Sequence, residues 1–215
     1  MQLDKTKNLD LSLYLITDEN YISNESFEFV MEETLKGGVT VVQLREKKSS
    51  TREFLEKAFL LKSLLAKYNV PLLINDRIDI ALACDADGVH IGQSDMPYMY
   101  ARKLLGKDKI IGISVESFEE VEKAQEFDVD YIAISPVFST TTKQNTKIEF
   151  GIEGVKKICS LSRHKTVAIG GINLDNAAEI INAGVDGIAV ISAILCAQNH
   201  YQAAVDFKSL TNKPQ

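Results

Sequence analysis

Short apolar segments recur along the chain and are separated by polar segments with helical periodicity. The apolar segments are rich in Val, Ile and Leu and lack a strict alternation of apolar and polar positions, as is typical of strands covered on both faces. The strand candidates are residues 13–17, 40–45, 71–75, 88–91, 109–113, 131–135, 166–169 and 187–191.

The segments between these strands carry apolar residues at helical spacing, most clearly Phe54, Ala58, Leu61 and Leu65. Strands that alternate with helices indicate βαβ units and a parallel sheet. Because eight strand candidates each precede a helix candidate, the pattern predicts an α/β protein with a single (β/α)8, or TIM, barrel domain over residues 1–215. Residues 1–10 would form a flexible or capping N-terminal segment.

A doubly wound open sheet is the alternative arrangement for the same order of elements. That fold usually carries a G-x-G-x-x-G motif after its first strand, where the backbone approaches a dinucleotide. The segment that follows residues 13–17 contains no such motif. The barrel is therefore the favoured architecture.

Composition and charge indicate which kinds of ligand and partner the protein has. The chain has 24 basic and 30 acidic residues, a net charge of −6, which argues against a nucleic-acid partner. Its three cysteines, Cys84, Cys159 and Cys196, are widely spaced and odd in number, as expected for reduced thiols. No apolar run approaches the ~18–20 residues of a membrane helix. We expect a cytoplasmic protein with small-molecule ligands; the oligomeric state, including a homo-oligomer, stays open.

Candidate chemistry lies at the carboxyl ends of the strands, where barrels of this type place their reactive groups. In the run Gln43-Leu44-Arg45-Glu46-Lys47, every second side chain shares one side, so Gln43, Arg45 and Lys47 would converge. Such donors suit a polyanion. The alternative is a solvated basic strand end paired with Glu46.

Two carboxylates follow the next two strands, Asp76 after Asn75 and Asp95 after the fourth strand. Neighbouring strands lie ~4.8 Å apart, so both carboxylates could reach one cation. Mg²⁺ prefers few carboxylates, some water and substrate phosphate oxygens. The alternative for each Asp is a helix N-cap.

The later strands end in hydroxyls and glycines. Ser114 follows the fifth strand, and the polar connection after the sixth holds Thr140, Thr141, Thr142 and Lys143. Gly170, Gly171, Ile191 and Ser192 end the last two strands, where backbone N–H groups of this fold often bind phosphate. The alternatives are a turn serine and a polar surface loop. We interpret His90 as a core histidine rather than a ligand.

Taken in order, these strand-end motifs resemble the thiamine phosphate synthase family over residues 13–195. The Q-L-R-E-K run together with T-x-T-K at residues 140–143 carries most of the resemblance. Ser135 and Ser139 stand where the family usually has Gly and Pro.

The resemblance implies a site for each substrate of a transferase. It assigns catalytic roles to Arg45, Lys47 and Lys143, and Mg²⁺ ligation to Asp76 and Asp95. It also implies two sets of binding residues. Those for the pyrimidine diphosphate are Gln43, Leu44, Arg45, Glu46, Lys47, Asn75, Ser114 and Lys143; those for the thiazole phosphate are Thr140, Thr141, Thr142, Gly170, Gly171, Ile191 and Ser192.

The implied reaction joins the pyrimidine to the thiazole nitrogen after dissociative loss of pyrophosphate. Three other readings stay open from the residues. A related barrel could tautomerise a thiazole without a metal site. A sugar-phosphate epimerase or lyase could use Asp76 and Asp95 as acid and base. A catalytically silent barrel would bind thiamine phosphates and release no pyrophosphate.

Overall fold

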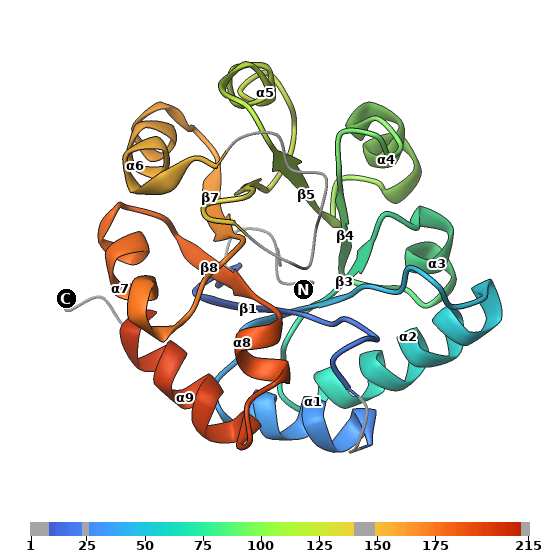
Figure 1. Ribbon diagram of the computed structural model, residues 1–215. Helices are drawn as coiled ribbons and strands as arrows, with labels where there is room; N and C mark the ends of the chain where they lie inside the picture. Colours follow the sequence, from blue (N-terminus) through green and yellow to red (C-terminus); the bar gives the residue numbers. More distant parts are fainter. Residues whose placement is uncertain (1–8, 23–25, 140–148, 212–215) are drawn as a thin grey trace.

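The computed structural model describes residues 9–22, 26–139 and 149–211. Strands and helices alternate along this part of the chain (Figure 1). The strands are β1 (Leu13–Ile16), β2 (Val41–Leu44), β3 (Leu72–Asn75), β4 (Gly88–Ile91), β5 (Ile110–Val115), β6 (Tyr131–Ile134), β7 (Lys165–Ile169) and β8 (Gly187–Val190). The helices are α1 (Phe27–Lys36), α2 (Thr51–Ala66), α3 (Ile78–Ala83), α4 (Tyr98–Leu105), α5 (Phe118–Ala124), α6 (Gly151–Leu161), α7 (Leu174–Asn182), α8 (Ser192–Leu195) and α9 (His200–Thr211).

The eight strands found in these residues form one closed parallel barrel in sequence order, with β8 paired to β1. Figure 1 looks along the barrel and shows the helices other than the short α8 as an outer ring, with α9 lying beside α1 and α7. This confirms the predicted (β/α)8 fold and excludes the open sheet. Each predicted strand agrees with an observed one to within two residues at either end.

The core divides into two clusters because alternate strand side chains point to opposite faces. The larger cluster lies between the strands and the helices and includes Phe54, Ala58, Leu61 and Leu65, the helical series recognised in the sequence. The smaller cluster fills the barrel interior around Tyr14 and Tyr131. The barrel is therefore packed inside, and a ligand can enter only near one of its ends.

Leu9, at the first described position, is buried in the inner cluster and accepts a hydrogen bond at its carbonyl from Lys165 Nζ at 2.6 Å. Residues 1–8 lie outside the described residues. The role predicted for the segment 1–10 and the single-domain extent over 1–215 therefore stay predictions. Among the described helices, none has the length and apolar character required to cross a membrane.

A repeated clamp ties the strands together at their amino ends. The residue just before β4, β6 and β8 is an aspartate whose carboxylate accepts the backbone N–H of the preceding strand, and Thr40 plays this part before β2. The pairs are Thr40 with Leu13, Asp87 with Leu72, Asp130 with Ile111 and Asp186 with Thr166, at 2.8–3.1 Å. These bonds satisfy N–H groups at the strand starts.

We expect Asp130→Ala to lower the free energy of unfolding by about 1–3 kcal/mol, because it leaves the Ile111 N–H buried without its acceptor. The change also removes the 3.1 Å ion pair with Arg102. Urea denaturation measures the effect. The matched control is Asp128→Ala, whose exposed carboxylate lies 3.6 Å from the same Arg102; it should shift stability by less than ~0.5 kcal/mol. Equal losses in both variants would contradict the clamp.

Candidate active site

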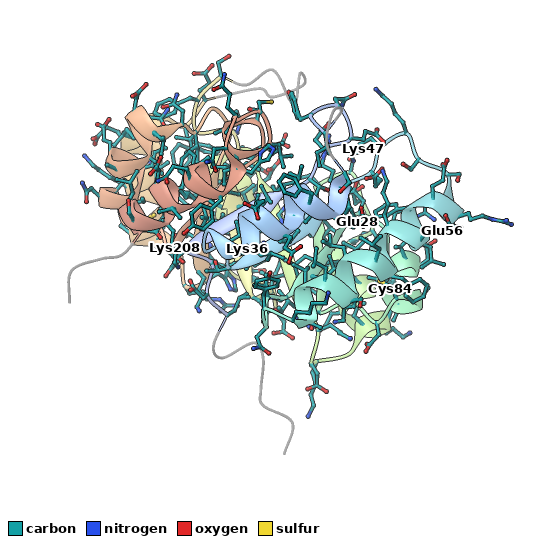
Figure 2. The ribbon with its side chains drawn as sticks, turned by 90° about the horizontal axis from the view of Figure 1, so that it is seen from below. Glu28, Lys36, Lys47, Glu56, Cys84 and Lys208 are labelled. Atoms are coloured by element: carbon teal, nitrogen blue, oxygen red, sulfur yellow. The ribbon has the colours of Figure 1, made fainter. Side chains whose placement is uncertain are left out.

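A cavity of about 1040 Å³ opens at the carboxyl ends of the strands. Figure 2 shows the barrel from the side, with Lys47 toward the upper end and Cys84, which follows α3, toward the lower end. Most of the residues predicted from the sequence line this cavity. They are Gln43, Arg45, Lys47, Asn75, Asp76, Asp95, Ser114, Gly170, Gly171, Ile191 and Ser192.

Leu44 and Glu46 are not among the residues that line the cavity. Leu44 is fully buried in the cluster between strands and helices, and Glu46 pairs with Lys57 of α2 at 2.9 Å. Their side chains face the helix layer because they alternate with Gln43, Arg45 and Lys47. The structure does not support a side-chain contact of Leu44 or Glu46 with a ligand.

The predicted hydroxyl and lysine cluster, Thr140, Thr141, Thr142 and Lys143, lies outside the described residues. Ser139, just before it, lines the cavity. The roles predicted for these four residues therefore stay predictions.

Arg45 is held by a carboxylate that the sequence analysis missed. Its Nη1 lies 2.5 Å from Oδ2 of Asp18, which is buried, and its backbone N–H donates to Thr17 Oγ1 at 3.0 Å. Thr17 and Asp18 directly follow β1. The strand-end argument applied to the other strands would have found Asp18. Its carboxylate fixes the guanidinium beside the cavity.

Lys47, Asp76 and Asp95 form a charged group on the rim. Lys47 Nζ lies 2.5 Å from Asp76 Oδ2, and Asp95 Oδ2 accepts the Gly92 N–H at 2.7 Å. Burial, followed by a hydrogen bond with Asp76, raises the pKa of the Asp95 carboxyl, and the like charge of Asp76 adds to the rise. Two carboxylates thus face one another.

These carboxylates are not helix caps. The N-cap of α3 is Arg77 and that of α4 is Pro97, so neither Asp76 nor Asp95 fills the structural role considered as the alternative. Asp76 also has a positive φ of 62°, uncommon for a residue other than glycine. A facing carboxylate pair open to the cavity fits Mg²⁺, which takes few carboxylates and completes its shell with water and phosphate oxygens. The described residues hold no group of three His, Cys, Asp or Glu that could bind a metal without such help.

The floor of the cavity is polar. Gln43, His90 and Ser114 line it, and His90 Nε2 lies 2.9 Å from Ser114 Oγ. Ser114 is inside β5, whereas the N-cap of α5 is Ser117, so the turn-serine alternative does not describe it. His90 is satisfied within the protein, as interpreted from the sequence, but it also reaches the cavity, which that interpretation did not anticipate.

The opposite wall is built from the ends of β7 and β8. Gly170 and Gly171 both have positive φ, 103° and 67°. A Cβ on Gly170 would lie 2.7 Å from Pro136 Cβ, and one on Gly171 would lie 2.7 Å from Ser139 O. The glycine pair thus lets the chain that leaves β6 pack across the end of β7. Ile191 and Ser192 begin α8 at the end of β8.

The chain is similar to known proteins in both sequence and structure. Residues 13–194 match the family model described as thiamine monophosphate synthase. The chain is 48% identical over 200 residues to the thiamine-phosphate synthase of Albidiferax ferrireducens, covering 93% of this chain and 91% of that one. It is 50% identical over 192 residues to the enzyme of that name from Clostridium acetobutylicum, covering 89% and 90%.

Among solved structures, the chain resembles a thiamine phosphate pyrophosphorylase from Pyrococcus furiosus with a TM-score of 0.87 and 39% identity, over 94% of this chain and 96% of that one. The family match covers all eight strands and the cavity-lining residues described above. The resemblance seen in the strand-end motifs is therefore confirmed, and the chain belongs to the thiamine monophosphate synthase family.

Proposed function

We propose that this protein condenses 4-amino-5-hydroxymethyl-2-methylpyrimidine diphosphate with 4-methyl-5-(2-phosphoethyl)thiazole to give thiamine phosphate and pyrophosphate. The observation that carries the proposal is the convergence of Arg45 and Lys47 with the carboxylates of Asp76 and Asp95 on the rim of one cavity. A diphosphate needs such cations together with a carboxylate-bound metal. The names of the similar proteins support the same reaction.

The rim would receive the diphosphate. Arg45, paired with Asp18, and Lys47, paired with Asp76, are held beside the cavity before any ligand arrives. Asp76 and Asp95 would hold Mg²⁺, which when bound neutralises charge on the departing pyrophosphate. Gln43 and Ser114 on the floor, with Asn75, would hold the pyrimidine ring, and Lys143 would reach the diphosphate from the connection after β6.

The chemistry follows from where charge develops. Breaking the bond between the pyrimidine methylene carbon and the diphosphate oxygen builds negative charge on the leaving group. Arg45 and Lys47 are preorganised to stabilise that charge, the kind of electrostatic effect that usually dominates such catalysis. The electron-rich aminopyrimidine can stabilise the carbocation left behind, so we propose that cleavage precedes attack. The thiazole nitrogen is already nucleophilic and requires no general base.

The wall of β7 and β8 would bind the second substrate. Gly171 and the backbone at Ile191 and Ser192 would contact the thiazole phosphate, because backbone N–H groups at a strand-to-helix turn suit an anion. Thr140, Thr141 and Thr142, with Gly170, would complete this side. We place the reaction in the cytoplasm, which the three free thiols of Cys84, Cys159 and Cys196 support.

The alternative activities lack a comparable observation. A thiazole tautomerase would not require a metal site such as the carboxylate pair beside Lys47. A sugar-phosphate epimerase would need Asp76 and Asp95 as separate acid and base, yet the two carboxylates lie against each other. A silent binder would share the binding site and would be distinguished by the absence of turnover.

With both substrates and Mg²⁺, we expect pyrophosphate release that matches thiamine phosphate formation mole for mole. Excess EDTA should abolish both products, and an excess of Mg²⁺ over EDTA should restore them. Omission of the thiazole phosphate is the control for simple hydrolysis. Binding of both substrates by the folded protein without pyrophosphate release would leave the silent binder as the better description.

We expect Asp95→Asn to raise the Mg²⁺ concentration for half-maximal rate by at least about tenfold, because it removes one metal ligand. The amide oxygen can still accept the Gly92 N–H, and the change relieves repulsion from Asp76. Stability in urea should therefore not fall. The control is Asp85→Asn near the amino end of β4, an exposed site where Asn tolerates the positive φ of 50°. Unchanged Mg²⁺ dependence in Asp95→Asn would remove Asp95 from the metal site.

We expect Lys47→Met to lower kcat by about 10²–10³-fold, the typical effect of losing one preorganised charge-stabilising group. The side chain of Lys47 is 49% exposed, so its loss should leave the fold intact. The adjacent Lys48→Met is the matched control, because Lys48 Nζ contacts Asn20 instead of the rim carboxylates. Steady-state kinetics with saturating Mg²⁺ measures both. Similar kcat values for the two variants would argue against a catalytic role for Lys47.

A further inference from the structure

A continuous hydrogen-bonded chain of five side chains runs through the barrel beneath the cavity. Gln43 Nε2 donates to Tyr14 Oη at 2.6 Å, and Tyr14 Oη lies 2.9 Å from Tyr131 Oη. Tyr131 Oη lies 2.9 Å from His90 Nδ1, and His90 Nε2 lies 2.9 Å from Ser114 Oγ. The two ends, Gln43 and Ser114, line the cavity, whereas Tyr14 and Tyr131 are buried below it.

The strand register places these hydrogen-bonded side chains around one glycine, Gly112. Gly112 of β5 is paired with His90 of β4 on one side and Tyr131 of β6 on the other. A Cβ at Gly112 would lie 2.0 Å from Tyr131 Cζ, so the phenol occupies space that any other residue would fill. The His90 and Tyr131 rings stack with centroids 5.6 Å apart, and Tyr14 meets Tyr131 edge-on at 5.9 Å. Glycine is required here by this close approach.

The donor at one end determines the direction of every bond. Burial raises the pKa of Tyr14 and of Tyr131, so both phenols keep their protons. The Gln43 amide nitrogen can only donate, so Tyr14 accepts from it and donates onward to Tyr131. Tyr131 then donates to His90 Nδ1, which requires the tautomer with its proton on Nε2. His90 in turn donates to Ser114 Oγ.

The two ends therefore present opposite groups to the cavity. Outside this hydrogen-bonded chain Gln43 keeps its carbonyl oxygen as an acceptor and its second amide N–H as a donor, and Ser114 keeps its hydroxyl hydrogen as a donor. A 4-aminopyrimidine is complementary to these two ends, because its amine can donate to the Gln43 carbonyl oxygen and an unprotonated ring nitrogen can accept from the Ser114 hydroxyl.

We propose that Tyr14, Tyr131 and His90 are positioning residues that set the donor and acceptor polarity of Gln43 and Ser114, and so select a 4-aminopyrimidine over its 4-oxo analogue. This inference rests on the proposed function and specifies how the same site recognises its first substrate. The 4-oxo ring carries a carbonyl and a ring N–H, which is the reverse pattern. Binding it would require reversal of every bond in the chain or leave buried polar groups without partners, and such sites discriminate strongly.

The test uses Tyr131→Phe, which removes the central hydroxyl and keeps the ring against Gly112. Calorimetry measures the affinity of wild type and variant for three probes: the 4-aminopyrimidine diphosphate, its 4-oxo analogue and inorganic pyrophosphate, all with Mg²⁺. We expect the variant to bind the amino compound about tenfold more weakly and to lose at least about tenfold of the amino-over-oxo preference. Pyrophosphate affinity and the KM for the thiazole phosphate should stay unchanged.

Tyr68→Phe is the matched control, because its hydroxyl donates to Glu32 on the outer surface and lies outside the chain. It should keep all three affinities. An unchanged amino-over-oxo ratio in Tyr131→Phe would overturn the positioning role while leaving the proposed function standing. Failure of the wild type to bind the pyrimidine diphosphate, with pyrophosphate still bound, would instead overturn the proposed function, and the inference with it.

A second readout does not depend on binding. Long-range ¹H–¹⁵N spectra report which ring nitrogen of a histidine carries the proton, and the His90→Gln spectrum assigns the His90 signals among the three histidines of the chain. We expect the Nε2-protonated tautomer in the wild type and a mixture in Tyr131→Phe. An Nδ1-protonated or doubly protonated His90 in the wild type would overturn the assigned direction.

Discussion

Hydrogen bonding between β1 and β8 closes the sheet, and the position of every polar group in the cavity depends on that closure. In a closed parallel barrel all strands end on one rim, so residues far apart in the sequence become neighbours. Side-chain alternation then decides which of them face the interior. Gln43, Arg45 and Lys47 face the cavity for this reason, and Leu44 and Glu46, between them, face the helices.

The clamps at the amino ends of the strands also hold the closed barrel together. Because a side chain before every second strand accepts an N–H from the strand before it, the strand register is secured at the end of the barrel opposite the cavity. An Asp-Gly pair stands at both Asp87-Gly88 and Asp186-Gly187, so two of these clamps share the same local sequence. The clamps and the cavity thus lie at opposite ends of the barrel, and the carboxyl end holds two carboxylates, Asp76 and Asp95, whose like charges repel one another.

The sequence allowed the eight strands to be predicted because each is a short apolar run followed by a helical pattern, a local signal. It also placed Asp76, Asp95 and Ser114 correctly on the cavity, since the strand-end rule requires only local boundaries. Asp18, the ion-pair partner of Arg45, was not predicted, although it also follows the carboxyl end of a strand. The chain from Gln43 to Ser114 could not be predicted, because the contact between Tyr14 and Tyr131 joins residues 117 positions apart and depends on the barrel's register. For Thr140, Thr141, Thr142 and Lys143 the prediction stands untested.

The buried chain also explains how a barrel can carry polar groups inside its core. A phenol, an imidazole and an amide would each cost several kcal/mol if buried without partners. Within the described residues, no buried side-chain nitrogen or oxygen lacks a hydrogen-bond partner. Pairing every buried polar group removes this desolvation cost. It also restricts the hydrogen-bonded side chains, because one bond can reverse its donor and acceptor only if the others reverse as well. The need to pair every buried polar group therefore stabilises the barrel interior and also fixes which groups Gln43 and Ser114 present to the cavity. The small size of Gly112 makes room for the Tyr131 ring on which this arrangement depends.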